Sequence, residues 1–281
     1  METTKQQTQS AGSLASKVED DDISSLVQSM RKANLKSGLP STFVDTREGI
    51  IDLVNNLPHR PTLPPALYID LEGINLCREG TISILQIFDN IDKCAYLVDV
   101  HTLGKKAFST RGAGGVTLKW ILESDLIPKA FFDVRNDSDA LYSHFGIKLA
   151  GIHDIQLMEL ATRPFSRTYV NGLAKCLDRD AQLSWEERRV CAQVKEKGRM
   201  LFAPEQGGSY DVFNARPLAE DMRSYCVHDV QFLPRLWSIY SKALTPVWRR
   251  KVDEATRNRI IESQSPNYVP NGRHKAMGPW Q

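Results

Sequence analysis

Short apolar runs in the first half of the chain alternate with polar segments and predict a set of strands. The run at 66–73 (Ala-Leu-Tyr-Ile-Asp-Leu-Glu-Gly) follows several prolines and predicts a buried strand that ends in two acids. Apolar runs at 81–88 and 95–100 predict two further strands. Because the connections between these three strands are short, an antiparallel meander is favoured.

From about residue 118 the pattern changes to an alternation of helix and strand. Helices are predicted at 118–124, at 138–145 and from 154 onward, with strands at 129–133 and 151–154. This alternation is typical of parallel strands joined by helical crossovers. We therefore expect an α/β protein with a mixed sheet, an antiparallel meander first and parallel strands afterwards, with helices on its faces.

The region between 165 and 243 is mostly helical in pattern. Helices are predicted at 169–177 and 185–194, with a loop at 198–214 that contains two adjacent glycines. A last long helix is predicted from 216–218 through Leu233, because proline is favoured in a first helical turn.

The two ends differ in composition from the middle. Residues 1–40 are rich in polar residues and carry an acidic run, which predicts a largely disordered segment with one short helix at 23–30. Residues 42–57 read as a strand followed by a helix. Residues 244–281 read as a basic helix that gives way to a flexible tail beyond about 264.

Composition restricts the class of protein. The chain has 281 residues, of which 41% are hydrophobic and 25% charged, and its net charge of +2 leaves any nucleic-acid contact to local patches. The five cysteines are scattered and show no C-x-x-C spacing, which argues against a disulfide framework and a structural zinc site. No signal peptide or apolar run of membrane-spanning length is present, so we expect an intracellular protein of the nucleus or cytoplasm.

The first candidate chemistry is the acid pair at the end of the 66–73 strand. Asp70 and Glu72 lie two residues apart and therefore point to the same face of a strand. Neighbouring carboxylates repel each other, and burial disfavours their charge further, so such a pair usually shares a divalent metal or a proton. The pair alone also fits two solvated acids that open a loop.

Two other places carry acids near a predicted sheet edge. Asp133, Asp137 and Asp139 stand where an apolar strand passes into a helix. Helix N-termini favour acids, so simple capping by Asp137 is an alternative to a functional role. Tyr225 and Asp229 lie four apart on one face of the last predicted helix, where a structural hydrogen bond is the alternative.

Taken in order, these motifs resemble those of the DEDD superfamily of 3′–5′ exonucleases, in its tyrosine subtype. Within that superfamily the chain is most similar to the ribonuclease D-like and Egalitarian-like exonuclease domains. The resemblance covers roughly residues 60–243. The supporting segments are 136–141, 145–147, 154–158 and 216–218.

The resemblance implies a ribonuclease H-like mixed sheet flanked by helices. It implies a 3′–5′ exonuclease domain at 41–243, preceded by the segment 1–40 and followed by 244–281. The implied activity is hydrolysis of phosphodiester bonds at the 3′ end of single-stranded nucleic acid, with RNA somewhat favoured over DNA. The alternative is an exonuclease fold used as an RNA-binding adaptor with little activity.

The resemblance also implies a set of site residues. Asp70, Glu72, Asp137 and Asp229 would hold two Mg²⁺ or Mn²⁺ ions, which prefer oxygen ligands. Asp70 would bridge both ions, Glu72 and Asp229 would hold the ion that carries the attacking water, and Asp137 would support the other. Tyr225 would position that water, since a phenol with a pKa of about 10 is a weak base at neutral pH.

Two details of the correspondence concern single positions. Counted back from the Phe-Gly-Ile at 145–147, Asp137 fits the second-motif acid best, and Asp139 and Asp133 are the alternatives. In the histidine subtype a histidine lies five residues before the last acid. Ser224 occupies that position here, so the tyrosine subtype is indicated and His228 is not the equivalent residue.

Several basic and aromatic residues are candidates for contact with the nucleic acid. For each of them a solvated helix face or a core position is the alternative. The phosphate-contact candidates are Arg135, Lys175, Arg188, Arg189 and Lys195, and the base-stacking candidates are Tyr142 and Phe145.

Overall fold

The computed structural model describes residues 39–57 and 62–280. From Ser41 onward the described residues form one compact unit. The helix expected at 23–30 lies outside the described residues. Within the described part of the chain, no helix is long and apolar enough to cross a membrane.

This compact unit is built on one six-stranded mixed sheet with the order β1-β4-β3-β2-β5-β6. The strands β2, β3 and β4 pair antiparallel, whereas β1 is parallel to β4, β5 to β2, and β6 to β5. The predicted meander followed by parallel strands is therefore confirmed. The strands are β1 (Ser41–Val44), β2 (Leu67–Glu72), β3 (Ile84–Asp89), β4 (Cys94–Asp99), β5 (Lys129–Phe131) and β6 (Ile152–Asp154).

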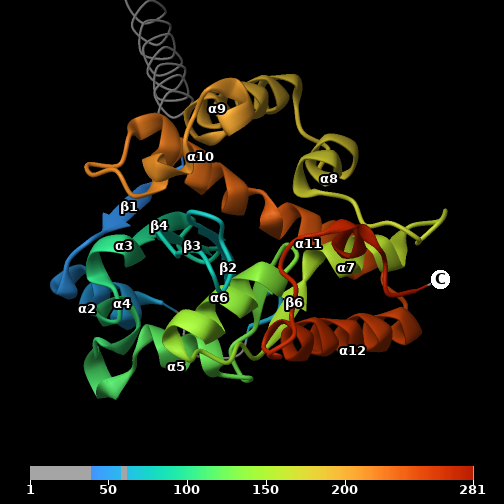
Figure 1. Ribbon diagram of the computed structural model, residues 1–281. Coiled ribbons are helices and arrows are strands. Elements are labelled where there is room, and N and C mark those ends of the chain that lie inside the picture. The colour runs from blue at the N-terminus through green and yellow to red at the C-terminus, as the bar shows by residue number, and fades with distance from the viewer. Residues whose placement is uncertain (1–38, 58–61, 281) are drawn as a thin grey trace, which may run out of the picture. The chain divides into compact units, whose positions relative to one another are not determined.

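Helices cover both faces of the sheet (Figure 1). The α-helices are α2 (Arg47–Asn56), α3 (Val100–Leu103), α4 (Lys106–Ser109), α5 (Leu118–Glu123), α6 (Arg135–Phe145), α7 (Ile155–Thr162), α8 (Leu173–Asp180), α9 (Trp185–Phe202), α10 (Glu220–Gln231), α11 (Leu233–Ala243) and α12 (Pro246–Ser263). The 3₁₀ helices are η1 (Ala113–Gly115), η2 (Pro204–Gln206), η3 (Tyr210–Phe213) and η4 (Arg273–Ala276).

The central strand β2 has two different faces. Leu67, Ile69 and Leu71 belong to the main hydrophobic core, which they share with buried residues of α2, α5 and α6. Because side chains alternate along a strand, Asp70 and Glu72 point to the opposite face. The helix α10 packs against β2, β3 and β4 and runs across the sheet in Figure 1. The acid pair of β2 therefore faces α10.

The predicted helices around α8 and α9 are displaced or lengthened in the structure. The helix α8 begins at Leu173, four residues after the predicted start of 169–177. The helix α9 begins where predicted, at a capping box formed by Ser184 and Glu187, but it continues to Phe202. The predicted loop at 198–214 is wrong in its first turn, because Gly198 lies buried inside the helix. The 3₁₀ helices η2 and η3 occupy much of the remainder.

The last long helix is also divided differently from the prediction. It begins at Glu220, so Pro217 precedes the helix and does not open it. It ends at Gln231, and a separate helix begins at Leu233 with Pro234 in its first turn. Proline has no N–H to donate and clashes with a preceding helical turn, so the helix cannot continue through Pro234. The preference of proline for a first helical turn, which predicted a helix start at Pro217, is observed instead at Pro234.

The C-terminal segment 264–280 runs back over the domain, where a flexible tail was expected. It forms an antiparallel bridge between Met277 and Tyr169. The backbone N–H of Val170 donates to the carbonyl of Ala276 at 2.9 Å. The helix α12 before it packs against α6, α7 and β6. Residues beyond the predicted exonuclease domain are thus hydrogen-bonded to that domain.

Candidate active site

The site is built on the end of β2, where Asp70 and Glu72 emerge. Both side chains are partly exposed, although the strand before them is fully buried. The chain turns directly after Glu72, because a side chain at Gly73 would overlap the backbone carbonyl of Thr81. Only glycine allows this approach, so the Gly that follows the acids fixes where the strand ends.

The helix α10 brings Asp229 to the same place. One carboxylate oxygen from each of Asp70, Glu72 and Asp229 lies within 4.8 Å of the others. Asp229 is 5% exposed, and its Oδ2 has no hydrogen-bond partner among the described residues. The structure therefore brings together three of the four acids that the sequence analysis singled out as metal ligands.

Asp137, in the first turn of α6, is the fourth acid. It is 5% exposed, and its Oδ1 finds no hydrogen-bond partner in the described part of the chain. Burial, followed by the charge of Asp133, raises the pKa of Asp137 to about 7. After burial, the charge of Asp137 is the largest cause that raises the pKa of Asp70. Asp137 is thus an electrostatic neighbour of the acid cluster.

The two alternatives to Asp137 are engaged elsewhere. Asp139 is fully buried and accepts hydrogen bonds at 2.7 Å from both the backbone N–H and the Nε of Arg78. Asp133 accepts two hydrogen bonds from Arg135, at 2.6 and 2.7 Å. Burial raises the pKa of Asp133, but the neighbouring guanidinium groups outweigh it and lower the pKa overall. Both acids are neutralised by arginine, whereas Asp137 is not.

The cluster resists ionisation. Burial, followed by the charge of Asp229, raises the pKa of Glu72 to about 8. Burial, followed by Asp137, Asp229 and Glu72, raises the pKa of Asp70 well above its usual range. Asp70, Glu72 and Asp137 therefore cannot all ionise at neutral pH without protons or an added cation to offset their charge. This is the electrostatic signature expected of an acidic metal site.

Lys195 of α9 supplies the nearest positive charge. Its ammonium donates a hydrogen bond to Oδ1 of Asp229 and lies 4.2 Å from the centroid of the Tyr225 ring. Burial and the acids Asp229 and Glu72 raise the pKa of Tyr225, so the phenol stays protonated. Of the five basic phosphate-contact candidates, Lys195 is the one with a direct contact to the acid cluster.

A glycine that the sequence analysis placed in a loop holds Tyr225 in position. Gly198 is buried in α9, and a Cβ there would overlap the ring of Tyr225. Phe202, one turn further along α9, contacts the same ring edge-on with centroids 5.1 Å apart. The helical spacing of Lys195, Gly198 and Phe202 was the available signal, since residues three and four apart share a helix face.

The remaining nucleic-acid candidates lie in other surroundings. Arg135 pairs with Asp133, Arg188 pairs with Asp178 at 2.5 Å, and the guanidinium of Arg189 lies over the Trp185 ring. Lys175 is exposed on α8. Phe145 packs against Phe108 with ring centroids 4.6 Å apart and belongs with the hydrophobic core. A core position was the alternative to its role in base stacking. Tyr142 is half-buried.

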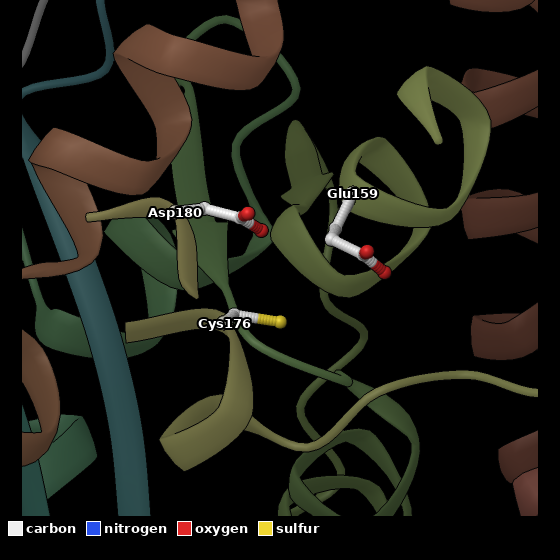
Figure 2. Close-up of side chains that lie close together, drawn as sticks. All are labelled: Glu159, Cys176 and Asp180. Atoms are coloured by element: carbon white, nitrogen blue, oxygen red, sulfur yellow. The ribbon is translucent and has the colours of Figure 1, made fainter. Parts of the chain in front are cut away.

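A second group of possible metal ligands lies on α7 and α8, where Glu159, Cys176 and Asp180 lie close together (Figure 2). Arg163 donates to both carboxylate oxygens of Glu159, at 3.0 and 2.5 Å, and Arg179 donates to one of them at 2.5 Å and to Asp180 at 2.7 Å. Burial raises the pKa of the Cys176 thiol to about 12, which keeps it protonated. Because both carboxylates of this group are already paired with arginine, the group is an ion-pair network.

The mixed sheet flanked by helices is a ribonuclease H-like fold, and the acid cluster lies at the end of its central strand β2. A family model described as 3′–5′ exonuclease matches residues 42–245, and the chain therefore belongs to the 3′–5′ exonuclease family. The 3′–5′ exonuclease resemblance seen in the sequence is confirmed by this match, and the ribonuclease D-like fold is confirmed by solved structures.

The chain is also similar to individual proteins. The piRNA biogenesis protein EXD1 of Mus musculus is 35% identical over 140 residues, which are 50% of this chain and 22% of that protein. The chain thus spans about a fifth of the length of this curated relative. Ribonuclease D of Trypanosoma brucei in complex with RNA U12 has a TM-score of 0.65 at 21% identity, covering 83% of this chain and 74% of its own. Escherichia coli ribonuclease D has a TM-score of 0.55 at 19% identity, covering 81% and 51%.

Proposed function

We propose that the protein is a metal-dependent 3′–5′ exonuclease of the tyrosine subtype that acts on single-stranded nucleic acid. The observation that carries the proposal is the cluster of Asp70, Glu72 and Asp229, with Asp137 as its electrostatic neighbour. A preference for RNA over DNA is supported by the ribonuclease D relative, which was solved with RNA. The name of the EXD1 relative also refers to RNA.

The donor atoms fit Mg²⁺ or Mn²⁺. All four side chains offer carboxylate oxygens, which hard cations prefer over nitrogen or sulfur. The buried oxygens Oδ1 of Asp137 and Oδ2 of Asp229 have no partner within the described residues, and a cation would satisfy them. Two ions held by Asp70, Glu72, Asp137 and Asp229 would supply an activated water and would stabilise the leaving 3′ oxygen.

Two side chains near the acids, those of Tyr225 and Lys195, have roles of their own in this proposal. The protonated phenol of Tyr225 donates a hydrogen bond and so orients the attacking water, and it does not remove a proton from it. Lys195 neutralises Asp229 in the metal-free protein. If cations were held by Asp229 in place of this ion pair, the Lys195 ammonium would be available to contact a phosphate of the terminal nucleotide.

The experiment is a cleavage assay on 5′-labelled single-stranded RNA and DNA with Mn²⁺, with Mg²⁺ and with a chelator. We expect stepwise loss of 3′ nucleotides that requires the metal and is abolished in Asp70→Asn. Asp52→Asn, which removes an exposed acid of α2, is the matched control and should cleave like the wild type. Cleavage by Asp70→Asn at a near-wild-type rate would refute the assignment. Binding without cleavage by the wild type would identify an RNA-binding adaptor instead.

A further inference from the structure

The part of the chain beyond the family match forms a hollow of its own. The helix α12 and the C-terminal segment 264–280 enclose about 840 Å³ of space, and they lie almost entirely outside the matched residues 42–245. A second hollow of about 600 Å³ adjoins it, and Lys251 and Trp280 line both. The two hollows are therefore neighbours that share a wall, and we call them together the C-terminal groove.

The C-terminal groove is predominantly basic. The first hollow is lined by Arg135, Lys251, Arg259 and Lys275 against two acids, Glu254 and Glu262. The second hollow adds Arg167 and no acid. A polyanion therefore complements the groove better than a neutral or cationic ligand does.

Not all of this charge is neutralised by the protein. Arg135 is paired with the partly exposed Asp133, and Arg259 with the fully buried Asp154. Lys251, in contrast, makes no ion pair within the described residues, and its Nζ lies 4.6 Å from the centroid of the Trp248 ring.

Arg167 lies on the same aromatic ring. Its guanidinium is 4.4 Å from the Trp248 centroid, and its hydrogen bonds go to the backbone carbonyls of Leu160, Ala161 and Arg163. Backbone carbonyls carry no net charge, so these hydrogen bonds leave the positive charge of Arg167 in place. Trp248 therefore holds two cations, Arg167 and Lys251, in fixed positions along the groove.

The groove also presents aromatic side chains. Trp280 contacts Trp248 edge-on with centroids 5.2 Å apart, and Tyr268 lines the first hollow. Aromatic rings interleaved with cations are the usual surface for an unpaired nucleic-acid strand, because bases stack on the rings while the cations contact phosphates.

One end of the groove lies beside the acid cluster. Lys275 donates a hydrogen bond to Oδ1 of Asn136, and the hydroxyl of Tyr268 donates to the same oxygen at 2.9 Å. Both residues line the groove, and Asn136 directly precedes Asp137 in α6. Arg135 Nη2 donates to the carbonyl of Lys275 at 2.9 Å, which fixes the segment there.

From this arrangement we propose that the C-terminal groove binds the single-stranded nucleic acid that extends from the 3′ end held at the acid cluster. Lys275, Lys251 and Arg167 contact successive phosphates, and the strand runs from α6 towards Trp248 and Trp280. The inference rests on the proposed exonuclease function for its direction, but binding in the groove does not require cleavage.

The test measures binding in chelator, where no cleavage occurs, with fluorescein-labelled oligouridylate of about 20 nucleotides. Lys251→Glu is expected to weaken binding about tenfold and to reduce the slope of log affinity against log salt by about one. Lys106→Glu, an equal charge reversal on α4 outside the groove, is the matched control and should bind like the wild type. Equal binding by Lys251→Glu and the wild type would overturn the proposal, as would competition by polyglutamate as strong as that by unlabelled oligouridylate.

A second measurement separates the groove from the active site. With Mn²⁺ present, the ratio of kcat/KM on the long substrate to that on a dinucleotide is expected to fall about tenfold in Lys251→Glu and to stay constant in Lys106→Glu. A constant ratio in Lys251→Glu would contradict binding of the strand in the C-terminal groove without contradicting the exonuclease function. Groove-dependent binding by a wild type that cleaves neither substrate would support the groove and refute the exonuclease.

Discussion

The ammonium of Lys195 on α9 donates a hydrogen bond to the carboxylate of Asp229 on α10. The lysine thus contributes one positive charge to a cluster in which burial and the neighbouring acids raise the pKa values of Asp70 and Glu72. A cation that binds the cluster must compete with this lysine for Asp229. The position of Lys195 therefore links the stability of the metal-free protein to metal binding.

We predict that Lys195→Met destabilises the metal-free protein, because it leaves Asp229 buried and unpaired. The loss should be about 1–3 kcal/mol, or a few degrees in Tm for a chain of this size. The measurement is thermal unfolding in chelator and again with Mn²⁺. Saturating Mn²⁺ should raise the Tm of Lys195→Met more than that of the wild type. An equal rise in both proteins would show that the lysine and the metal do not compete.

Gly198 gives a prediction about the position of Tyr225. The Cβ in Gly198→Ala would overlap the Tyr225 ring, so that α9 and α10 must move apart. We expect a loss of about 1–3 kcal/mol of stability from this overpacking. We also expect kcat to fall about 10- to 100-fold as the phenol is displaced. Gln193→Ala, at an exposed position of the same helix, is the control for a substitution in α9.

The assay for Gly198→Ala should be run well below its Tm, so that unfolding does not reduce the rate. A folded Gly198→Ala protein that retains wild-type kcat would show that the position of Tyr225 is not critical. A fall in kcat with an unchanged KM would support a role for the phenol in the chemical step.

The sequence predicted the sheet well because its strands carry clear local signals. The run that contains Asp70 and Glu72 ends at a glycine, and the short connections after it permit little except a meander. The convergence of Asp229 on that strand end could be proposed only because the motifs occur in a recognisable order. Periodicity alone does not show which helix crosses the sheet.

The helices from α8 to α11 were predicted less accurately, for identifiable reasons. Gly198 suggested a loop because glycine is unfavourable inside a helix, but its packing against Tyr225 outweighs that preference. Two prolines, Pro217 and Pro234, both fit a helix start, and only tertiary contacts show that the second one does so. The packing of 264–280 depends on hydrogen bonds to α6 and to 168–170, which are remote in sequence.

The raised pKa values predict how stability depends on pH. In the folded protein Glu72 keeps its proton up to about pH 8 and Asp137 up to about pH 7, whereas unfolded carboxyls lose theirs near pH 4. Between those limits the folded state binds more protons than the unfolded state, so the free energy of unfolding falls as pH rises. Thermal unfolding in chelator should therefore show a Tm that decreases from about pH 5 to about pH 8.

Metal should reverse this trend, because carboxylates must lose their protons to bind a cation. Mn²⁺ is expected to raise the Tm more at about pH 8 than at about pH 6. In the double variant Asp70→Asn, Glu72→Gln the decline in Tm with pH should be smaller and the response to Mn²⁺ weaker. A metal-free wild type whose Tm rises across this range would contradict the assigned protonation of the cluster.

The choice among the three acids near the start of α6 gives the last prediction. Asp137→Asn changes a buried carboxylate whose Oδ1 lacks a partner among the described residues, so it should abolish cleavage at little cost in stability. Asp139→Asn breaks a buried pair with Arg78 and should cost about 3 kcal/mol, while the folded fraction still cleaves. Arg78 also donates to the carbonyls of Ser263 and Ser265, so the loss should loosen the end of α12.

Urea unfolding and single-turnover cleavage of both variants, measured on the same preparations, separate the two roles. Asp137→Asn is expected to be inactive and stable, and Asp139→Asn to be active and destabilised. The opposite result, in which folded Asp139→Asn is inactive and Asp137→Asn cleaves normally, would assign the second-motif acid to Asp139. That reassignment would need Arg78 to leave Asp139 before a metal could bind, because its Nε lies 2.7 Å from Oδ1 of that carboxylate.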